Sequence, residues 1–256
     1  MKNTTSHQNP MARVMSLRDF RLLFAGAATS LLGDQFTLIA TPWLVLKLTN
    51  DPMALGIVLA LEGIPRAVFM LLGGAISDHF SPRRVMLIAN ITRFVLTAMM
   101  AILVYLGLIQ LWMIYGFGLA FGIVAGFAIP AENSIVPMLV EEKDLQAGIS
   151  LMMGVTQIAG FVGPTIAGIL IGQITTSNMG IVLSFTFDAL TFVVSAISLW
   201  MIRAGKNIKS NIDPSTRENV WTAILAGIKY LWTDRALRLI FLVLMAVNFL
   251  MMGPLL

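Results

Sequence analysis

The chain has 256 residues, of which 57% are hydrophobic and 12% are charged, and its formal net charge is +4. Soluble domains carry about 25% charged residues, so this composition indicates an integral membrane protein rather than a soluble domain. With no Cys and only two His, His7 and His79, the sequence excludes disulfides and thiolate chemistry, and we expect neither a metal nor another cofactor.

Seven segments are long and apolar enough to cross a membrane. A bilayer core about 30 Å thick needs roughly 20 helical residues, because each residue advances the helix by about 1.5 Å. In chain order the segments lie at residues 20–46, 54–77, 84–106, 110–130, 145–173, 179–203 and 237–256. The first is too long for a signal peptide, so we expect it to stay on the chain. The seventh runs to the last residue, which suggests a fragment of a longer protein.

The basic residues predict the orientation of these spans. Loops rich in Lys and Arg stay on the cytoplasmic side, and the loops before span one and after spans two, four and six carry nearly all of them. On the opposite side only Lys47 is basic. We therefore expect a multi-pass protein of the cell membrane with a cytoplasmic N-terminus. Because the basic residues form no continuous stripe, nucleic acid is not an expected partner.

One long polar stretch suggests a division of the chain. Residues 1–203 would form a six-helix transmembrane domain, residues 204–236 a cytoplasmic linker, and residues 237–256 the first helix of a second domain. Within the linker, apolar residues between Val220 and Trp232 recur at helical spacing. This pattern predicts an amphipathic helix at the membrane surface.

Five charged residues fall inside the predicted spans: Asp34, Glu62, Arg66, Arg93 and Asp188. Each costs about 2.5 to 3.5 kcal/mol near the bilayer centre, so each should face a partner, a neighbouring helix or a water-filled cavity. Glu62 and Arg66 are four residues apart on one helix and are expected to form an ion pair, with a gating role as the alternative. Three acids against two bases leave one acid without a counter-charge.

Glu132 occurs in "PAEN", just after the predicted fourth span. We interpret it as a solvated or helix-capping acid, and a gate contact is the alternative.

The turn "GGAISDHFSPRRV" resembles the signature turn of the major facilitator superfamily. Gly74, Asp78, Arg83 and Arg84 match that motif, whereas His79 and Ser81 depart from it. The resemblance implies a cytoplasmic gate, in which this turn latches two halves of a transporter together.

"GFVGPTIAG" resembles the Gly-Pro motif that the superfamily associates with exporters. Gly160, Gly163, Pro164 and Gly168 match. Longer runs resemble the branch of macrolide-efflux proteins and siderophore exporters. The resemblance covers the whole chain and implies twelve spans in two halves, each with an internal 3+3 repeat, of which this chain would be the first half plus one helix. The basic residue usual on span four is absent, because that span has no charge.

The resemblance also suggests partners for the remaining charges. It places Arg93 and Asp188 on equivalent helices of the repeat, which favours a buried ion pair between them. Asp34 is then the acid left over, on the span that lines the central cavity. We expect it to carry protons or contact a cationic substrate, with a structural hydrogen bond as the alternative.

The sequence therefore predicts a proton-coupled secondary transporter that exports small amphipathic compounds by alternating access. Its partners would be a small-molecule substrate, protons and the lipid bilayer. The alternative is a non-transporting fragment, or a half-transporter that needs a second half or a second copy. A nucleotide-binding loop is absent, and no nucleophile with a base is found, so we expect no enzymatic activity and no catalytic residue.

Overall fold

The structure is a computed structural model that describes residues 9–79, 81–173, 178–203, 232–240 and 242–243, with the backbone alone for residues 71–79. The chain divides into two compact units, residues 1–210 and 211–256. In the second unit, the carboxylate of Asp234 accepts hydrogen bonds from the backbone nitrogens of Ala236 and Leu237, at 2.8 and 3.2 Å. These bonds cap a short helical stretch.

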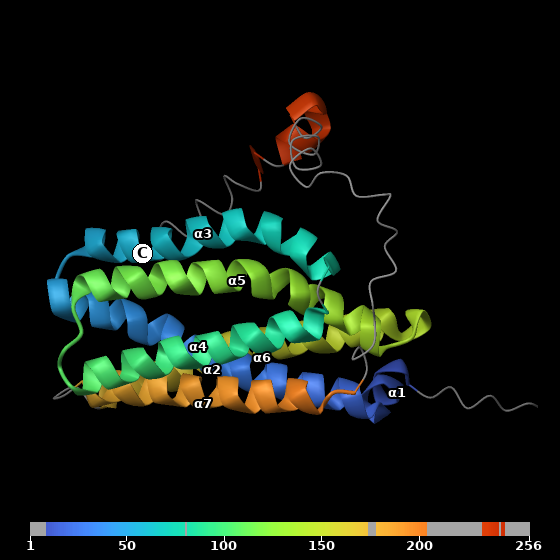
Figure 1. Cartoon of the computed structure of the whole chain (residues 1–256), viewed down its shortest axis with the longest axis horizontal. Helices are drawn as coiled ribbons and strands as arrows, with labels where there is room; N and C mark the ends of the chain where they lie inside the picture. The colour runs from blue at the N-terminus through green and yellow to red at the C-terminus, as the bar shows by residue number, and fades with distance from the viewer. Residues whose placement is uncertain (1–8, 80, 174–177, 204–231, 241, 244–256) are drawn as a thin grey trace, which may run out of the picture. The chain divides into compact units, whose positions relative to one another are not determined.

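The first unit is all-helical in its described residues, as the sequence predicts (Figure 1). A 3-10 turn, Glu142–Asp144, precedes α6. The helices are α1 (Pro10–Ser16), α2 (Arg18–Thr49), α3 (Pro52–His79), α4 (Pro82–Tyr105), α5 (Leu111–Leu139), α6 (Leu145–Gln173) and α7 (Met179–Met201).

Six membrane-spanning helices among the described residues confirm the first six predicted spans. Their ends lie within a few residues of the predicted ones, with a single exception. Most of the predicted seventh span, residue 241 and residues 244–256, lies outside the described residues, and so do residues 220–231 of the predicted amphipathic helix in the linker. The internal 3+3 repeat stays a prediction.

The exception is α5, which continues to Leu139 instead of ending at residue 130. Pro130 and Pro137 lie inside this helix, although proline removes a backbone hydrogen bond. Membrane helices tolerate proline because neighbouring helices and polar side chains can satisfy the backbone groups that it frees. Helix α5 therefore carries Glu132 within its length rather than beyond its end.

A seam of glycines brings α5 against α3. Gly118, Gly122 and Gly126 recur every four residues on one face of α5. A Cβ atom at Gly118 would lie 3.3 Å from the Val58 carbonyl oxygen, and one at Gly126 would lie 2.6 Å from Cβ of Phe69. Small residues at this spacing allow close packing of helix backbones inside a membrane.

Two apolar clusters lie toward opposite ends of the six-helix bundle. One is built around Leu44, Val58 and Phe185, and the other around Phe20 and Ile135. The charged residues near the middle of α2 and α4 belong to neither cluster. The bundle therefore has a polar layer between two apolar cores.

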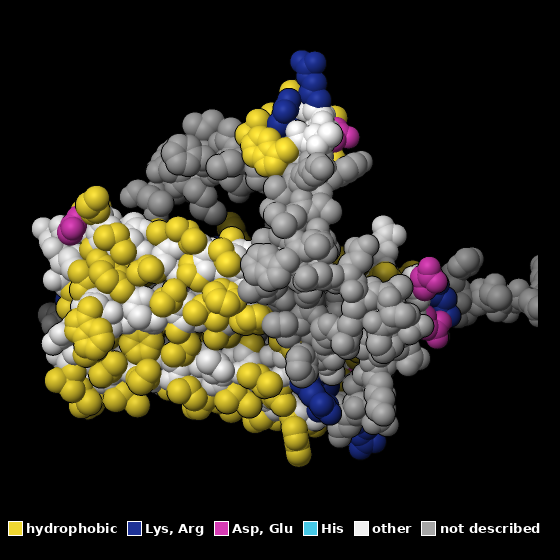
Figure 2. Space-filling view, turned by 45° about the horizontal axis from the view of Figure 1, so that its top comes forward, with side chains coloured by type: hydrophobic (Ala, Val, Ile, Leu, Met, Phe, Trp, Pro, Cys, Tyr) yellow, Lys and Arg dark blue, Asp and Glu magenta, His cyan; other side chains and the backbone are white. Residues whose placement is uncertain are grey.

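The outer surface fits a lipid environment. Figure 2 shows hydrophobic side chains over much of the described face, with charged ones toward its ends. Trp43, Tyr105 and Trp112 are all exposed and lie near one end of α2, α4 and α5. Aromatic side chains at this level are typical of the membrane–water interface.

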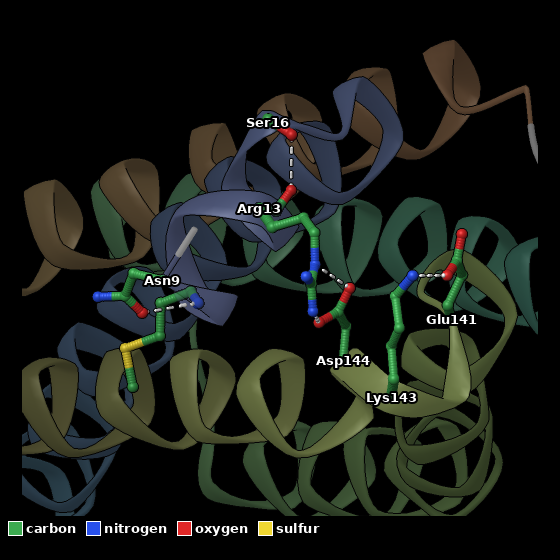
Figure 3. A network of polar contacts seen from close by, with 7 residues as sticks. Asn9, Arg13, Ser16, Glu141, Lys143 and Asp144 are labelled. Carbon is green, nitrogen blue, oxygen red and sulfur yellow. Dashed lines mark hydrogen bonds and ion pairs between the residues drawn. The ribbon is translucent and has the colours of Figure 1, made fainter. Parts of the chain in front are cut away.

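At the other end, α1 is tied to the turn before α6 (Figure 3). The Arg13 guanidinium donates to Asp144 through Nε, at 2.7 Å, and also through a second nitrogen. These hydrogen bonds raise the pKa of Arg13 above its ordinary value. Val14 beside it is fully buried in the apolar cluster around Phe20. A two-point ion pair and one apolar anchor thus fix this short helix.

Candidate functional site

Two cavities lie inside the six-helix bundle. The α6-side cavity has a volume of about 570 Å³ and is lined by α2, α4, α5, α6 and α7. The α3-side cavity has a volume of about 320 Å³ and is lined by α2, α3, α4, α5 and α7. Three charged residues line both of them: Asp34, Arg93 and Glu132. These three side chains form the boundary between the cavities.

The α3-side cavity brings together the five charged residues that the sequence analysis singled out. Asp34, Glu62, Arg66, Arg93 and Asp188 come from four different helices and all line it. Each of these residues therefore lies beside a cavity, as the cost of burying a charge in a membrane favours. Their roles in proton or substrate binding stay predictions.

Arg93 pairs with Glu132 rather than with Asp188. Its Nη1 lies 3.7 Å from Oε1 of Glu132, and its guanidinium carbon is 5.8 Å from the centre of the Phe192 ring. The Arg93 side chain is 13% exposed and that of Glu132 is 42% exposed. The predicted ion pair between Arg93 and Asp188 is therefore wrong for the part of the chain that the structure describes.

Asp188 is satisfied by hydroxyl groups instead. Its Oδ2 accepts a hydrogen bond from Thr37 of α2 at 2.5 Å, and Thr191 lies 3.4 Å from Oδ1. The absence of a side chain at Gly33 leaves room for these contacts between α2 and α7, because a Cβ atom at Gly33 would overlap both Asp188 and Thr191. Asp188 is 1% exposed and belongs to the α2–α7 interface. This packing turns the carboxyl toward α2 and explains why Arg93 is not its partner.

Asp34 has no hydrogen bond and no ion pair within the described residues. It lies near the middle of α2, is half-buried, and lines both cavities. A carboxyl in this position can exchange a proton or meet a cation from either cavity, since no base is held against it in an ion pair.

Glu62 and Arg66 line the same cavity without pairing. Among the described residues the structure has no ion pair between them, although their spacing places both on one face of α3. The predicted pair is wrong, because spacing of four residues brings two side chains near each other without fixing their rotamers. Arg66 is exposed and Glu62 is half-buried.

A second polar contact crosses the bundle beside the α6-side cavity. The buried amide of Asn90 on α4 donates to the hydroxyl of Ser195 on α7 at 2.8 Å. The sequence did not predict this pair, because neither residue carries a charge. The prediction that Glu132 lies just beyond the fourth span is wrong, since α5 extends past it to Leu139. Continuing the fourth hydrophobic run through Pro130 would have included it.

In the described part of the chain, no group of three or more acidic or His side chains could hold a metal ion. The polar side chains that line the two cavities supply carboxyl, guanidinium, hydroxyl and amide groups.

The transmembrane secretion effector family matches residues 9–253, almost the whole chain. The chain belongs to this family. The family is a branch of the major facilitator superfamily, and the match confirms the resemblance noted from the sequence motifs.

Curated relatives of this chain are named as an exporter, an efflux protein and a transporter. The enterobactin exporter EntS of Salmonella typhimurium is 23% identical over 83% of the chain and 49% of its own length. Macrolide efflux protein A of Streptococcus pyogenes is 23% identical over 77% of the chain and 48% of its own length. The staphyloferrin A transporter of Staphylococcus aureus is 25% identical over 59% and 38%. The chain spans about half the length of the curated relatives it matches, or less.

The signature turn of the superfamily lies at the end of α3 and the start of α4. Gly74 and Asp78 are helical, but their side chains lie outside the described residues. Arg83 donates to the carbonyls of Leu199 and Trp200 at the C-terminus of α7, at 2.6 and 2.7 Å. Arg84 is exposed. Arg83 thus caps α7 within the six-helix bundle, and the gate role of these residues stays a prediction.

The Gly-Pro motif of the superfamily lies in the middle of α6. Gly163 packs against α2, where a Cβ atom would lie 2.5 Å from Cβ of Gln35. Gly160 and Gly168 have open space beside them, and Pro164 is inside the helix. The motif therefore joins α6 to α2 at one residue and leaves its other glycines exposed.

Proposed function

We propose that the protein containing this chain is a proton-coupled transporter that exports small amphipathic compounds by alternating access. Membership of a transporter superfamily supports transport rather than catalysis. The relatives named as exporters support the direction. The N-terminus lies in the cytoplasm in this proposal, as the distribution of Lys and Arg favours.

One observation carries the coupling step. Asp34 lines both cavities and has no hydrogen bond or ion pair within the described residues. A carboxyl at a boundary between two cavities can take up a proton from one side and release it to the other when the surrounding helices move. The acids of the α3-side cavity outnumber its bases, which supports exchange of positive charge at this layer.

The test uses transport in vesicles with an imposed pH gradient. Asp34→Asn keeps the size of the side chain and removes the exchangeable proton. We expect proton-driven transport of a fluorescent amphipathic dye to be lost, while expression and thermal stability stay at the wild-type level. Glu141→Gln is the control, because Glu141 is exposed and its carboxylate forms a surface ion pair with Lys143. Wild-type coupling in Asp34→Asn would remove Asp34 from the mechanism.

A second candidate follows from the length of the match. Since the chain spans about half of its curated relatives, the 256-residue chain is the first half of a transporter and acts only with a second half. Vesicles that contain this chain alone should then show no dye transport above empty vesicles. Gradient-driven transport by the chain alone would reject this candidate. Cross-linking would then show whether two copies of the chain assemble.

A further inference from the structure

We propose that the outer surface between α4 and α7 binds an anionic phospholipid, at the end of the bundle where α4 begins and α7 ends. Arg84 and Arg203 hold the phosphate, and the acyl chains lie along exposed apolar side chains of the two helices. This inference goes beyond the proposed function, because it holds whether or not the protein exports a compound. Neither arginine lines either of the two cavities.

Two polar contacts place α4 and α7 side by side. The Arg83 guanidinium donates to the carbonyl oxygens of Leu199 and Trp200, at 2.6 and 2.7 Å. Farther along the pair, the Asn90 amide donates to the Ser195 hydroxyl at 2.8 Å. Residue numbers rise along α4 as they fall along α7, so the two helices are antiparallel. The start of α4 therefore lies beside the end of α7.

Two arginine side chains at this end are exposed and have no fixed counter-charge. Arg84 lies in the first turn of α4, and Arg203 follows the end of α7. The backbone nitrogen of Arg203 donates to the carboxylate of Asp19 at 3.0 Å, which fixes the chain at this point. Neither guanidinium has a hydrogen bond or an ion pair within the described residues. Both are therefore available to an anion, and the guanidinium fork fits a phosphate.

An exposed apolar surface continues from these arginines along both helices. Its side chains recur every three or four residues, so they share one face of each helix: Ile88, Ile91 and Val95 on α4, and Val194, Ile197 and Trp200 on α7. Trp200 is 69% exposed and lies beside Arg83, at the charged end of this surface. Tryptophan in a membrane protein favours the level of the lipid headgroups. The surface below it suits acyl chains.

The order of these groups along the helices selects the ligand. Positive charge at the end of the spans, followed by apolar surface within them, matches the order of phosphate and acyl chains in a phospholipid. A zwitterionic lipid also carries a cationic group, which two arginines repel. Basic sites between membrane helices on the cytoplasmic side are known to bind anionic headgroups. The proposed orientation places this end of the bundle in the cytoplasm, next to the anionic lipids of the inner leaflet.

Native mass spectrometry of the purified protein tests the inference. The protein is titrated with phosphatidylglycerol, or with phosphatidylcholine that has the same acyl chains. We expect tighter binding of phosphatidylglycerol. Its affinity should fall about fivefold in Arg84→Gln and in Arg203→Gln, the factor that one basic residue near the membrane surface contributes. Both arginines are exposed, so these changes carry little risk to folding.

Lys143→Gln is the matched control, because it removes one exposed positive charge from the turn before α6. We expect it to leave the affinity for phosphatidylglycerol unchanged. Equal affinity for the two lipids would overturn the inference. An equal loss of affinity in all three variants would also overturn it, because the lipid would then respond to overall charge rather than to this surface.

Fluorescence quenching locates the acyl chains. Bromine atoms on an acyl chain quench a nearby tryptophan, and the signal of Trp200 is the difference between the wild-type protein and Trp200→Phe. We expect brominated phosphatidylglycerol to quench this signal more strongly than brominated phosphatidylcholine at the same mole fraction. Equal quenching would show that Trp200 contacts only bulk lipid, and would reject the site.

Glycerol 3-phosphate separates a lipid from a free phosphate. It carries the same phosphate without acyl chains, so it should not displace phosphatidylglycerol at millimolar concentration. Displacement at that concentration would reject a lipid as the ligand.

Discussion

The packing of α3 against α5 depends on the absence of a side chain at Gly122. A Cβ atom there would lie 3.0 Å from the carbonyl carbon of Glu62 and 3.1 Å from its Cα, and closer still to its carbonyl oxygen. These are backbone atoms, so no change of rotamer can relieve the overlap. In Gly122→Ala the two helices must separate, and the contacts of Gly118 and Gly126 on the same face are weakened with them.

The expected loss of stability follows from two opposing effects. Overpacking of a close helix interface lowers the free energy of unfolding by about 1–3 kcal/mol. The upper part of this range applies to Gly122→Ala, because the backbone of α3 or α5 must move to relieve the overlap. Replacing glycine by alanine in a helix also gains up to about 1 kcal/mol. Gly116→Ala on the same helix includes this gain without the overlap, because a Cβ atom at Gly116 would meet no side chain and no neighbouring helix within 4 Å. Gly122→Ala should therefore be about 2–3 kcal/mol less stable than Gly116→Ala.

The assay is equilibrium unfolding in mixed detergent micelles, followed by helical circular dichroism. Each variant is compared with the wild-type protein and with the other. Equal unfolding free energies for Gly122→Ala and Gly116→Ala would refute the close approach of α3 and α5. Glu62 also lines the α3-side cavity, so separation of α3 and α5 should change access to that cavity. The rate at which a small thiol-reactive reagent labels a Cys introduced into the cavity would measure this change.

Two further predictions concern the arginines. Exchanging the charges of Arg93 and Glu132 should restore the expression that is lost in either single variant. Exchanging Arg93 with Asp188 should not restore it. Rescue by the exchange with Asp188, but not by the exchange with Glu132, would reject the observed pairing. Arg83→Gln should lower stability by about 1 kcal/mol through loss of the contacts that cap α7, while Arg84→Gln should change it little. Equal thermal denaturation curves for the two variants would argue against capping by Arg83.

The spans were predictable because their cause is local. A hydrophobic run of sufficient length forms a helix in the membrane, since its backbone must satisfy its own hydrogen bonds. The predicted and observed boundaries of α6, residues 145–173, coincide. The failure at α5 came from treating Pro130 as an end, although in this environment a helix can continue through proline.

The partners of the charges were not predictable by the same reasoning. The order of residues along α7 places Asp188 within a span but does not determine which neighbouring helix it faces. Close packing at Gly33 turns Asp188 to Thr37, and the added length of α5 brings Glu132 to Arg93. Both contacts join residues far apart in the chain.

The sequence by itself determined that this chain forms apolar helices with a small number of charges inside them, because hydrophobicity and length act within each segment. Only the tertiary structure decided that, among the described residues, Asp34 is left without a fixed partner between two cavities. Pairing between helices depends on how their surfaces fit, and glycine positions, helix length and side-chain direction set that fit together.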